Sequence, residues 1–199
     1  MSISTYAELV TAVGDWLDRD DLTARVPTFI QLAEARLNRL LEDPEMDVTV
    51  TTAATGDATA LPADFGSMVS VSVGDGQLAA TGPVEFAGYD TTISGNPRRY
   101  MIVDGAISFW PGDGSASIRM VYRRRLPALT VSNTTNWLLT LAPDAYLYGA
   151  LVQASAFLAE DDRLELWKMS FDEAIGELRA DGSRRKWGAG PIAPRIRRA

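Results

Sequence analysis

The spacing of apolar residues changes twice along the chain, and this change constrains the fold more than any other feature. Before residue 45 and after residue 136, apolar side chains recur three or four positions apart, the period of a helix with one buried face. Over 46–126 they alternate with polar side chains, the period of a half-buried strand. Each helical face needs a partner, so we predict that helices from both chain ends pack together around a β-rich insertion.

The first helical region contains two start signals. Thr5 and Glu8 have the spacing of a capping box, which predicts a helix from about residue 6. The dipeptide Val26-Pro27 predicts the start of a second helix, because proline is tolerated in the first helical turn. We expect this helix to end before Asp43-Pro44, since the residue before a proline disfavours helical geometry.

The middle region has the pattern of short antiparallel strands. Residues 68–73 alternate small polar with apolar side chains. The segments 100–103 and 106–110 flank Asp104-Gly105, a pair that favours the type I′ turn of a tight hairpin. We therefore predict a mainly antiparallel sheet.

The last helical region is expected to contain two helices. Pro143-Asp144 predicts the start of one, and the acidic run 160–162 separates it from another that ends before Gly182. The predicted fold class is α+β, mainly α. It comprises a four-helix bundle of 1–45 and 136–181, an inserted β-rich region of 46–135, and an extended C-terminal arm of 182–199.

The charge of the chain is segregated toward that arm. The last eighteen residues hold six basic side chains and no acid. Because the whole chain has 19 Lys and Arg and 26 Asp and Glu, the remainder has 13 basic against 26 acidic residues, a net charge of −13. A basic segment that also contains Gly188, Gly190, Pro191 and Pro194 is typical of a strap that orders on a partner, although a solubilising end has the same composition.

The composition also limits the chemistry. The chain has no histidine and no cysteine. This excludes Ser-His-Asp and Cys-His catalysis, HExxH metal sites and thiolate chemistry. We expect no enzymatic activity, no metal and no other cofactor, and we interpret the acids at 160–162 as helix caps rather than a cation site. No apolar run has membrane-spanning length, and the first residues lack a signal-peptide pattern, so we expect synthesis in the cytoplasm and no membrane partner.

A second basic group, Arg123, Arg124 and Arg125, ends a predicted strand. These side chains could face DNA, pair with acids of a neighbouring subunit, or be solvated. The acidic composition of the rest of the chain favours the neighbour, so we name them as candidate inter-subunit residues.

Several segments resemble the head–tail adaptor (connector) proteins of tailed bacteriophages. Residues 29–37 are similar to the second-helix segment of that family. A later part of the chain resembles the podovirus-type adaptor pattern. It comprises residues 136–139, 143–151 and 160–163, followed by Trp167.

The resemblance implies a structural virion protein at the head–tail interface, assembled in the host cytoplasm. It implies a homo-oligomeric, twelve-fold ring beneath the portal protein, around a channel through which DNA passes without sequence-specific binding. The next tail component, a nozzle or stopper, would bind to this ring. The C-terminal arm would dock on the portal, and the candidate portal-binding residues are Arg184, Arg185, Lys186, Trp187, Ile192, Arg195, Arg197 and Arg198.

Two other classes of protein remain open at this point. One is a different head-completion or tail protein, such as a stopper or tail terminator, but those are commonly richer in β-structure. The other is a regulatory module that binds nucleic acid through the basic arm. No helix-turn-helix with base-reading side chains supports that class.

Overall fold

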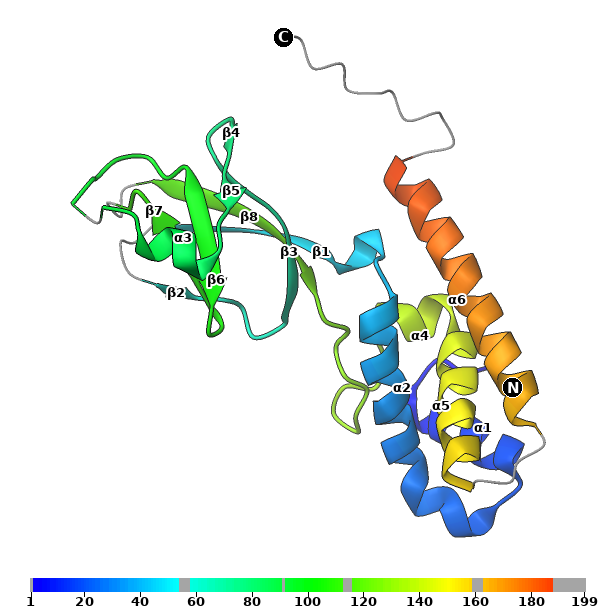
Figure 1. The fold of residues 1–199 in the computed structure, drawn as a ribbon. Coiled ribbons are helices and arrows are strands. Elements are labelled where there is room, and N and C mark those ends of the chain that lie inside the picture. Colours follow the sequence, from blue (N-terminus) through cyan, green and yellow to red (C-terminus); the bar gives the residue numbers. More distant parts are fainter. Residues whose placement is uncertain (1, 54–57, 91, 113–115, 159–162, 188–199) are drawn as a thin grey trace. The chain divides into compact units, whose positions relative to one another are not determined.

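The computed structural model describes residues 2–53, 58–90, 92–112, 116–158 and 163–187. The chain divides into two compact units, one formed by Met1–Glu45 with Leu126–Ala199 and the other by Met46–Arg125. The first unit is helical and the second is mainly β (Figure 1). The α+β class is therefore confirmed.

The helical unit contains five α-helices in the part of the chain that is described. They are α1 (Tyr6–Leu17), α2 (Val26–Leu40), α4 (Trp137–Leu141), α5 (Pro143–Leu158) and α6 (Leu164–Trp187), and a 3₁₀ helix, η1 (Asp20–Arg25), joins α1 to α2. Helix α5 contacts α1, α2, α4 and α6. Helices from both chain ends thus share one core, as the hydrophobic period predicted.

The local signals at the helix ends are present in the structure. The Thr5 hydroxyl accepts from the Glu8 backbone N–H at 3.3 Å, and the Glu8 carboxylate accepts from the Thr5 backbone N–H at 3.0 Å, which completes the capping box. Helix α2 begins at Val26 with Pro27 in its first turn.

Helix α5 is the centre of the helical core. Tyr146 and Leu151 on α5 and Phe171 on α6 are fully buried. Gly149 lets α5 approach its neighbours, because a Cβ atom there would lie 3.0 Å from the Phe171 ring and 3.2 Å from Ala33 Cβ. The crossing of α2, α5 and α6 therefore depends on a residue without a side chain.

The β unit contains two four-stranded sheets among its described residues. The strand orders are β1-β8-β3-β4 and β2-β7-β6-β5. The bounds are β1 Asp47–Ala53, β2 Thr59–Ala60, β3 Phe65–Val73, β4 Gly76–Gln77, β5 Ala79–Ala80, β6 Arg99–Val103, β7 Ala106–Trp110 and β8 Ser117–Arg124, with the short helix α3 (Pro83–Ala87) after β5. One core joins the sheets through Val71, Ile107, Phe109, Ile118 and Met120.

The predicted hairpin is confirmed, and the described strands form two mainly antiparallel sheets where the sequence predicted one. Strands β6 and β7 pair antiparallel around Asp104 (φ 52°) and Gly105 (φ 70°), both in the left-handed region that a type I′ turn requires. However, β5 and β6 pair in parallel. Strand β5 has only two residues, too few for a hydrophobic period to reveal it.

Two predicted boundaries of the helical unit are wrong. Helix α6 continues through Gly182 to Trp187 instead of ending before Gly182. The chain returns to the helical unit at Leu126 rather than at residue 136. Leu126 and Leu129 are buried there, and their backbone N–H groups donate to Asn38 Oδ1 and Glu34 Oε1 of α2 at 2.7 and 2.8 Å. The short helix α4 was not predicted either.

Candidate functional site

The last turn of α6 contains four of the candidate portal-binding residues: Arg184, Arg185, Lys186 and Trp187. The expectation that they lie in an extended arm is wrong, because the helix continues past Gly182. As neighbours on a helix they point in different directions, about 100° apart. The other candidates, Ile192, Arg195, Arg197 and Arg198, lie outside the described residues.

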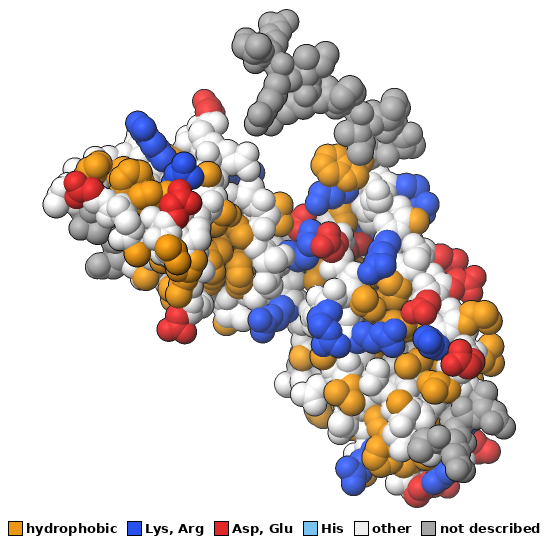
Figure 2. Space-filling model, viewed as in Figure 1, with side chains coloured by type: hydrophobic (Ala, Val, Ile, Leu, Met, Phe, Trp, Pro, Cys, Tyr) orange, Lys and Arg blue, Asp and Glu red, His pale blue; other side chains and the backbone are white. Residues whose placement is uncertain are grey.

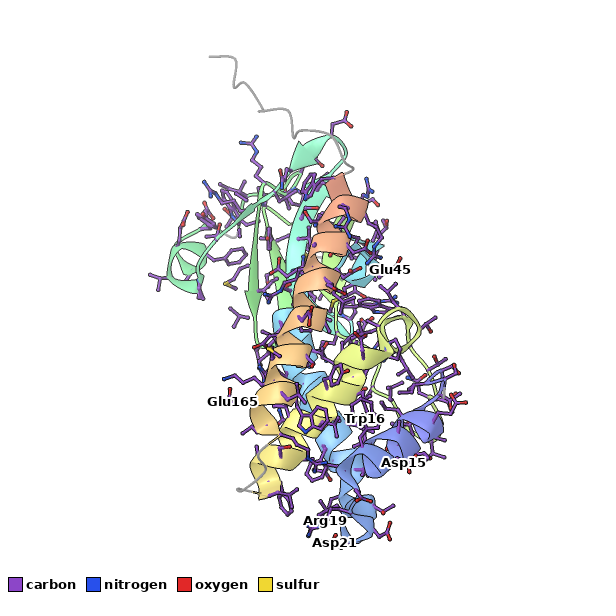
Figure 3. All side chains as sticks on the ribbon, turned by 90° about the vertical axis from the view of Figure 1, so that its right-hand side faces the viewer. Asp15, Trp16, Arg19, Asp21, Glu45 and Glu165 are labelled. Atoms are coloured by element: carbon purple, nitrogen blue, oxygen red, sulfur yellow. The ribbon has the colours of Figure 1, made fainter. Side chains whose placement is uncertain are left out.

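Arg185 is bound within its own chain. Its Nη2 lies 2.7 Å from Asp43 Oδ2, its Nε 2.9 Å from Asp181 Oδ2, and its Nη1 3.7 Å from Glu45 Oε1. The Asp43 side chain is 3% exposed and also accepts from the Glu45 backbone N–H at 2.9 Å. Figure 3 shows Glu45 beside the C-terminal half of α6, whereas Glu165 marks the first turn of the same helix. Arg185 therefore anchors the segment after α2 to the end of α6.

Gly182 explains how the buried carboxylate fits against α6. A Cβ atom at this position would lie 2.8 Å from Asp43 Oδ2. Glycine within a helix costs about 1 kcal/mol relative to alanine, so sequence reasoning interprets it as an end signal. Here the missing side chain makes room for the ion pair between Asp43 and Arg185.

Replacing Arg185 with alanine is expected to lower the free energy of unfolding by about 2 kcal/mol, because it leaves the buried Asp43 carboxylate without its cation. Arg184→Ala is the matched control: Arg184 is 65% exposed, and its one ion pair with the described part of the chain is to Asp181, at 3.4 Å. That control should change stability by less than about 0.5 kcal/mol. Urea denaturation measures both, and equal losses would remove the anchoring role from Arg185.

The other two residues of the turn are directed to the surface. Trp187 is 57% exposed, and the Lys186 ammonium lies 5.8 Å from the centroid of its ring. An exposed aromatic beside cations is the composition of an interface anchor. Lys186 and Trp187 are therefore better placed than Arg185 to meet a partner.

Two grooves flank the C-terminal half of α6. The groove that we call acidic has a volume of ≈490 Å³, and its lining includes Leu141, Asp144, Ala174, Glu177, Leu178 and Asp181. The groove that we call basic has a volume of ≈540 Å³, and its lining includes Arg39, Leu40, Glu42, Arg179, Lys186 and Trp187. Figure 2 shows Lys and Arg side chains gathered over α2 and α6 of the helical unit.

The second basic group lies in the β unit, at the end of β8. Arg123 Nε is 3.4 Å from Asp47 Oδ1, and their side chains are 16% and 18% exposed, so Arg123 pairs with an acid of its own chain. Arg124 is half-buried and Arg125 is exposed. The role of these arginines between subunits stays a prediction.

A buried polar network was not predicted from the sequence. Glu34 on α2 is 6% exposed and accepts from the Leu129 N–H at 2.8 Å and the Tyr146 hydroxyl at 3.3 Å. Asn136 Nδ2 donates to the Tyr146 oxygen at 2.7 Å. Burial raises the pKa of the Glu34 carboxyl, and the two hydrogen bonds partly offset this effect. The spacing Ile30, Glu34, Leu37 on the buried face of α2 was the available signal.

Within the described ranges, no three carboxylates are grouped so that they could hold a metal ion. Residues 160–162, interpreted above as helix caps, lie outside those ranges. The described helices include none that is both long and apolar enough to cross a bilayer.

The sequence profile of a family described as "SU10 adaptor protein" matches residues 4–195. A search of curated proteins found no match.

Proposed function

The chain belongs to the SU10 adaptor protein family, and on this premise we propose that it is a bacteriophage head–tail adaptor. It forms a ring under the portal protein, docks on the portal through its C-terminal end, and supports the next tail component around the DNA channel. The function is structural, with no catalysis and no cofactor. The observation that carries this proposal is the extent of the family match, which includes both units and reaches into the basic C-terminal segment.

Portal docking uses the exposed end of α6 together with the segment that follows it. Arg184, Lys186 and Trp187 supply two cations and an aromatic anchor on a helix that Arg185 holds in place. Ile192, Arg195, Arg197 and Arg198 extend this surface with one apolar and three cationic side chains. Carboxylates of the portal pair with the arginines, and an apolar pocket receives Trp187 or Ile192.

A ring multiplies these contacts. Each copy contributes one C-terminal end, so weak individual contacts add to a tight attachment by avidity. The remainder of the chain has a net charge of −13, and such a body repels DNA that passes through a central channel.

Truncation after Trp187 tests the docking. Removing 188–199 is expected to leave the melting temperature unchanged, because every described contact of the helical core lies before that point. It should reduce capture on portal rings at least about tenfold, since three arginines are lost from each copy. A cut at residue 183 is a poor variant, because it also removes Arg185 from Asp43.

The matched point variant is Trp187→Ala, which removes the anchor but no charge. A pull-down on purified portal rings compares full-length, truncated and Trp187→Ala protein. Equal capture of all three would remove the C-terminal end from the docking mechanism. Salt-sensitive binding of duplex DNA by the full-length chain, without portal capture, would favour the nucleic-acid module instead.

A further inference from the structure

We infer that the surface around the acidic groove of one copy packs against the surface around the basic groove of the next copy, and that this contact closes the ring. The inference rests on the proposed ring, and it adds which surfaces of the chain form the subunit interface. A ring of identical chains needs two different, complementary patches on each copy. The two grooves beside α6 meet this requirement.

The grooves lie on opposite flanks of one helix. Glu177 in the acidic groove and Lys186 in the basic groove are nine positions apart, which places them about 180° apart around α6. Buried residues of α6 that line neither groove, such as Phe171 and Ile175, lie between the two flanks. One straight helix therefore presents both patches in a fixed relation, as repeated head-to-tail contacts require.

The acidic groove has an acidic rim and an apolar floor. Asp144, Glu177 and Asp181 supply three carboxylates against one cation of the lining, Arg184, and Asp181 pairs with both Arg184 and Arg185. Glu177 and Asp144 form no ion pair with any described residue of the chain. Leu141 is 48% exposed at this groove, so apolar area is also available for burial.

The basic groove has the complementary composition. Its lining contains three cations, Arg39, Arg179 and Lys186, against one carboxylate, Glu42. Arg39 and Arg179 face the next copy, while Lys186 at the end of α6 stays with Trp187 for the portal. Arg179 is oriented by hydrogen bonds of 2.8 and 3.3 Å to the Leu40 carbonyl, which fixes one cation at the end of α2. Arg39 forms no ion pair with any described residue.

The charge complementarity between the two grooves identifies the occupant as a second copy of this chain. Each groove carries an excess of one sign, and the opposite excess is found on the other flank of the same helix. Complementary charges of this kind select the partner and set the register of an interface, whereas like charges placed together oppose it.

Charge reversal tests the pairing. Arg39→Glu cancels the positive excess of the basic groove and sets a carboxylate against Glu177 of the next copy. Glu177→Lys cancels the negative excess of the acidic groove and sets a cation against Arg39, so either variant alone should lose rings at least about tenfold. A mixture of the two variants should restore them, because the copies can alternate around the ring. The chain that contains both changes should also form rings. Native mass spectrometry, on the free protein and on portal rings, counts the copies.

Two controls separate charge from position. Arg119→Glu in β8 and Glu165→Lys in the first turn of α6 make the same chemical changes on exposed residues that line neither groove, and they should leave ring formation unchanged. Melting curves check that every variant folds. Ring formation by the wild type should weaken as salt rises, since screening acts on exposed charges.

The outcomes are distinguishable. If the wild type forms rings and the single reversals form them equally well, or if the mixture fails to restore them, the groove pairing is wrong while the ring stands. If the wild type stays monomeric both in solution and on portal rings, the proposed ring is wrong and the pairing with it. Loss in both single variants with restoration in the mixture supports the pairing, because no other partner alternates in this way.

Discussion

Replacing Leu151 with aspartate is expected to lower the free energy of unfolding by at least about 4 kcal/mol, because it places a carboxylate in an apolar core. Leu151 is fully buried on α5, the helix that contacts α1, α2, α4 and α6. Leu147→Asp, at a side chain that is 6% exposed, should cost several kcal/mol for the same reason.

Leu32→Asp is the matched control for both changes. Leu32 lies on α2 and is 48% exposed, so the same substitution there should cost less than about 1 kcal/mol. Thermal and urea unfolding followed by far-ultraviolet circular dichroism report on the helices. If Leu151→Asp melts with the control, the assignment of α5 as the centre of the core is wrong.

The second large effect concerns Glu34. Glu34→Ala is expected to lower the free energy of unfolding by about 3 kcal/mol, because the buried Leu129 N–H loses its acceptor and a cavity opens. The Tyr146 hydroxyl also loses an acceptor. The loss should also loosen the segment from Leu126 to Asn136, whose backbone and side chains are bonded to α2 and α5. Hydrogen exchange at the Leu129 amide measures this local effect.

Glu34→Gln separates the charge from the hydrogen bonds. Its amide oxygen still accepts from Leu129, so the variant should be at least as stable as the wild type at neutral pH. The wild-type carboxyl has a raised pKa, so the folded chain binds more protons there than the unfolded chain. Its contribution to stability is complete below the unfolded pKa and is lost as pH rises through the folded pKa.

Glu34→Gln should remove that loss, so its stability should fall less than that of the wild type as pH rises from acid to neutral. Denaturant titrations of both proteins across this range give the comparison. Parallel curves would show that Glu34 does not titrate between the folded and unfolded states.

Helices, strands and turns that are specified by residues close together in the sequence could be predicted from the sequence. The capping box at Thr5, the proline in the first turn of α2, the start of α5 at Pro143 and the turn at Asp104-Gly105 all act through neighbouring residues. Their physical causes are capping bonds, fixed φ angles and hydrophobic periods, which span a few positions. The α+β class followed from the same local patterns.

The contacts of the candidate site depend on tertiary structure. Arg185 and Asp43 are 142 positions apart, and Glu34 and Leu129 are 95 apart, so no local pattern joins them. Gly182 carries the local signal of a helix end, yet α6 continues through it, and Asp43 occupies the space of its missing side chain. The described basic residues at the end of α6, Arg184, Arg185 and Lys186, could be found from the sequence, but their division between an internal anchor and exposed groove residues could not. That division depends on which acids the packing of α2 against α6 brings within ion-pair distance.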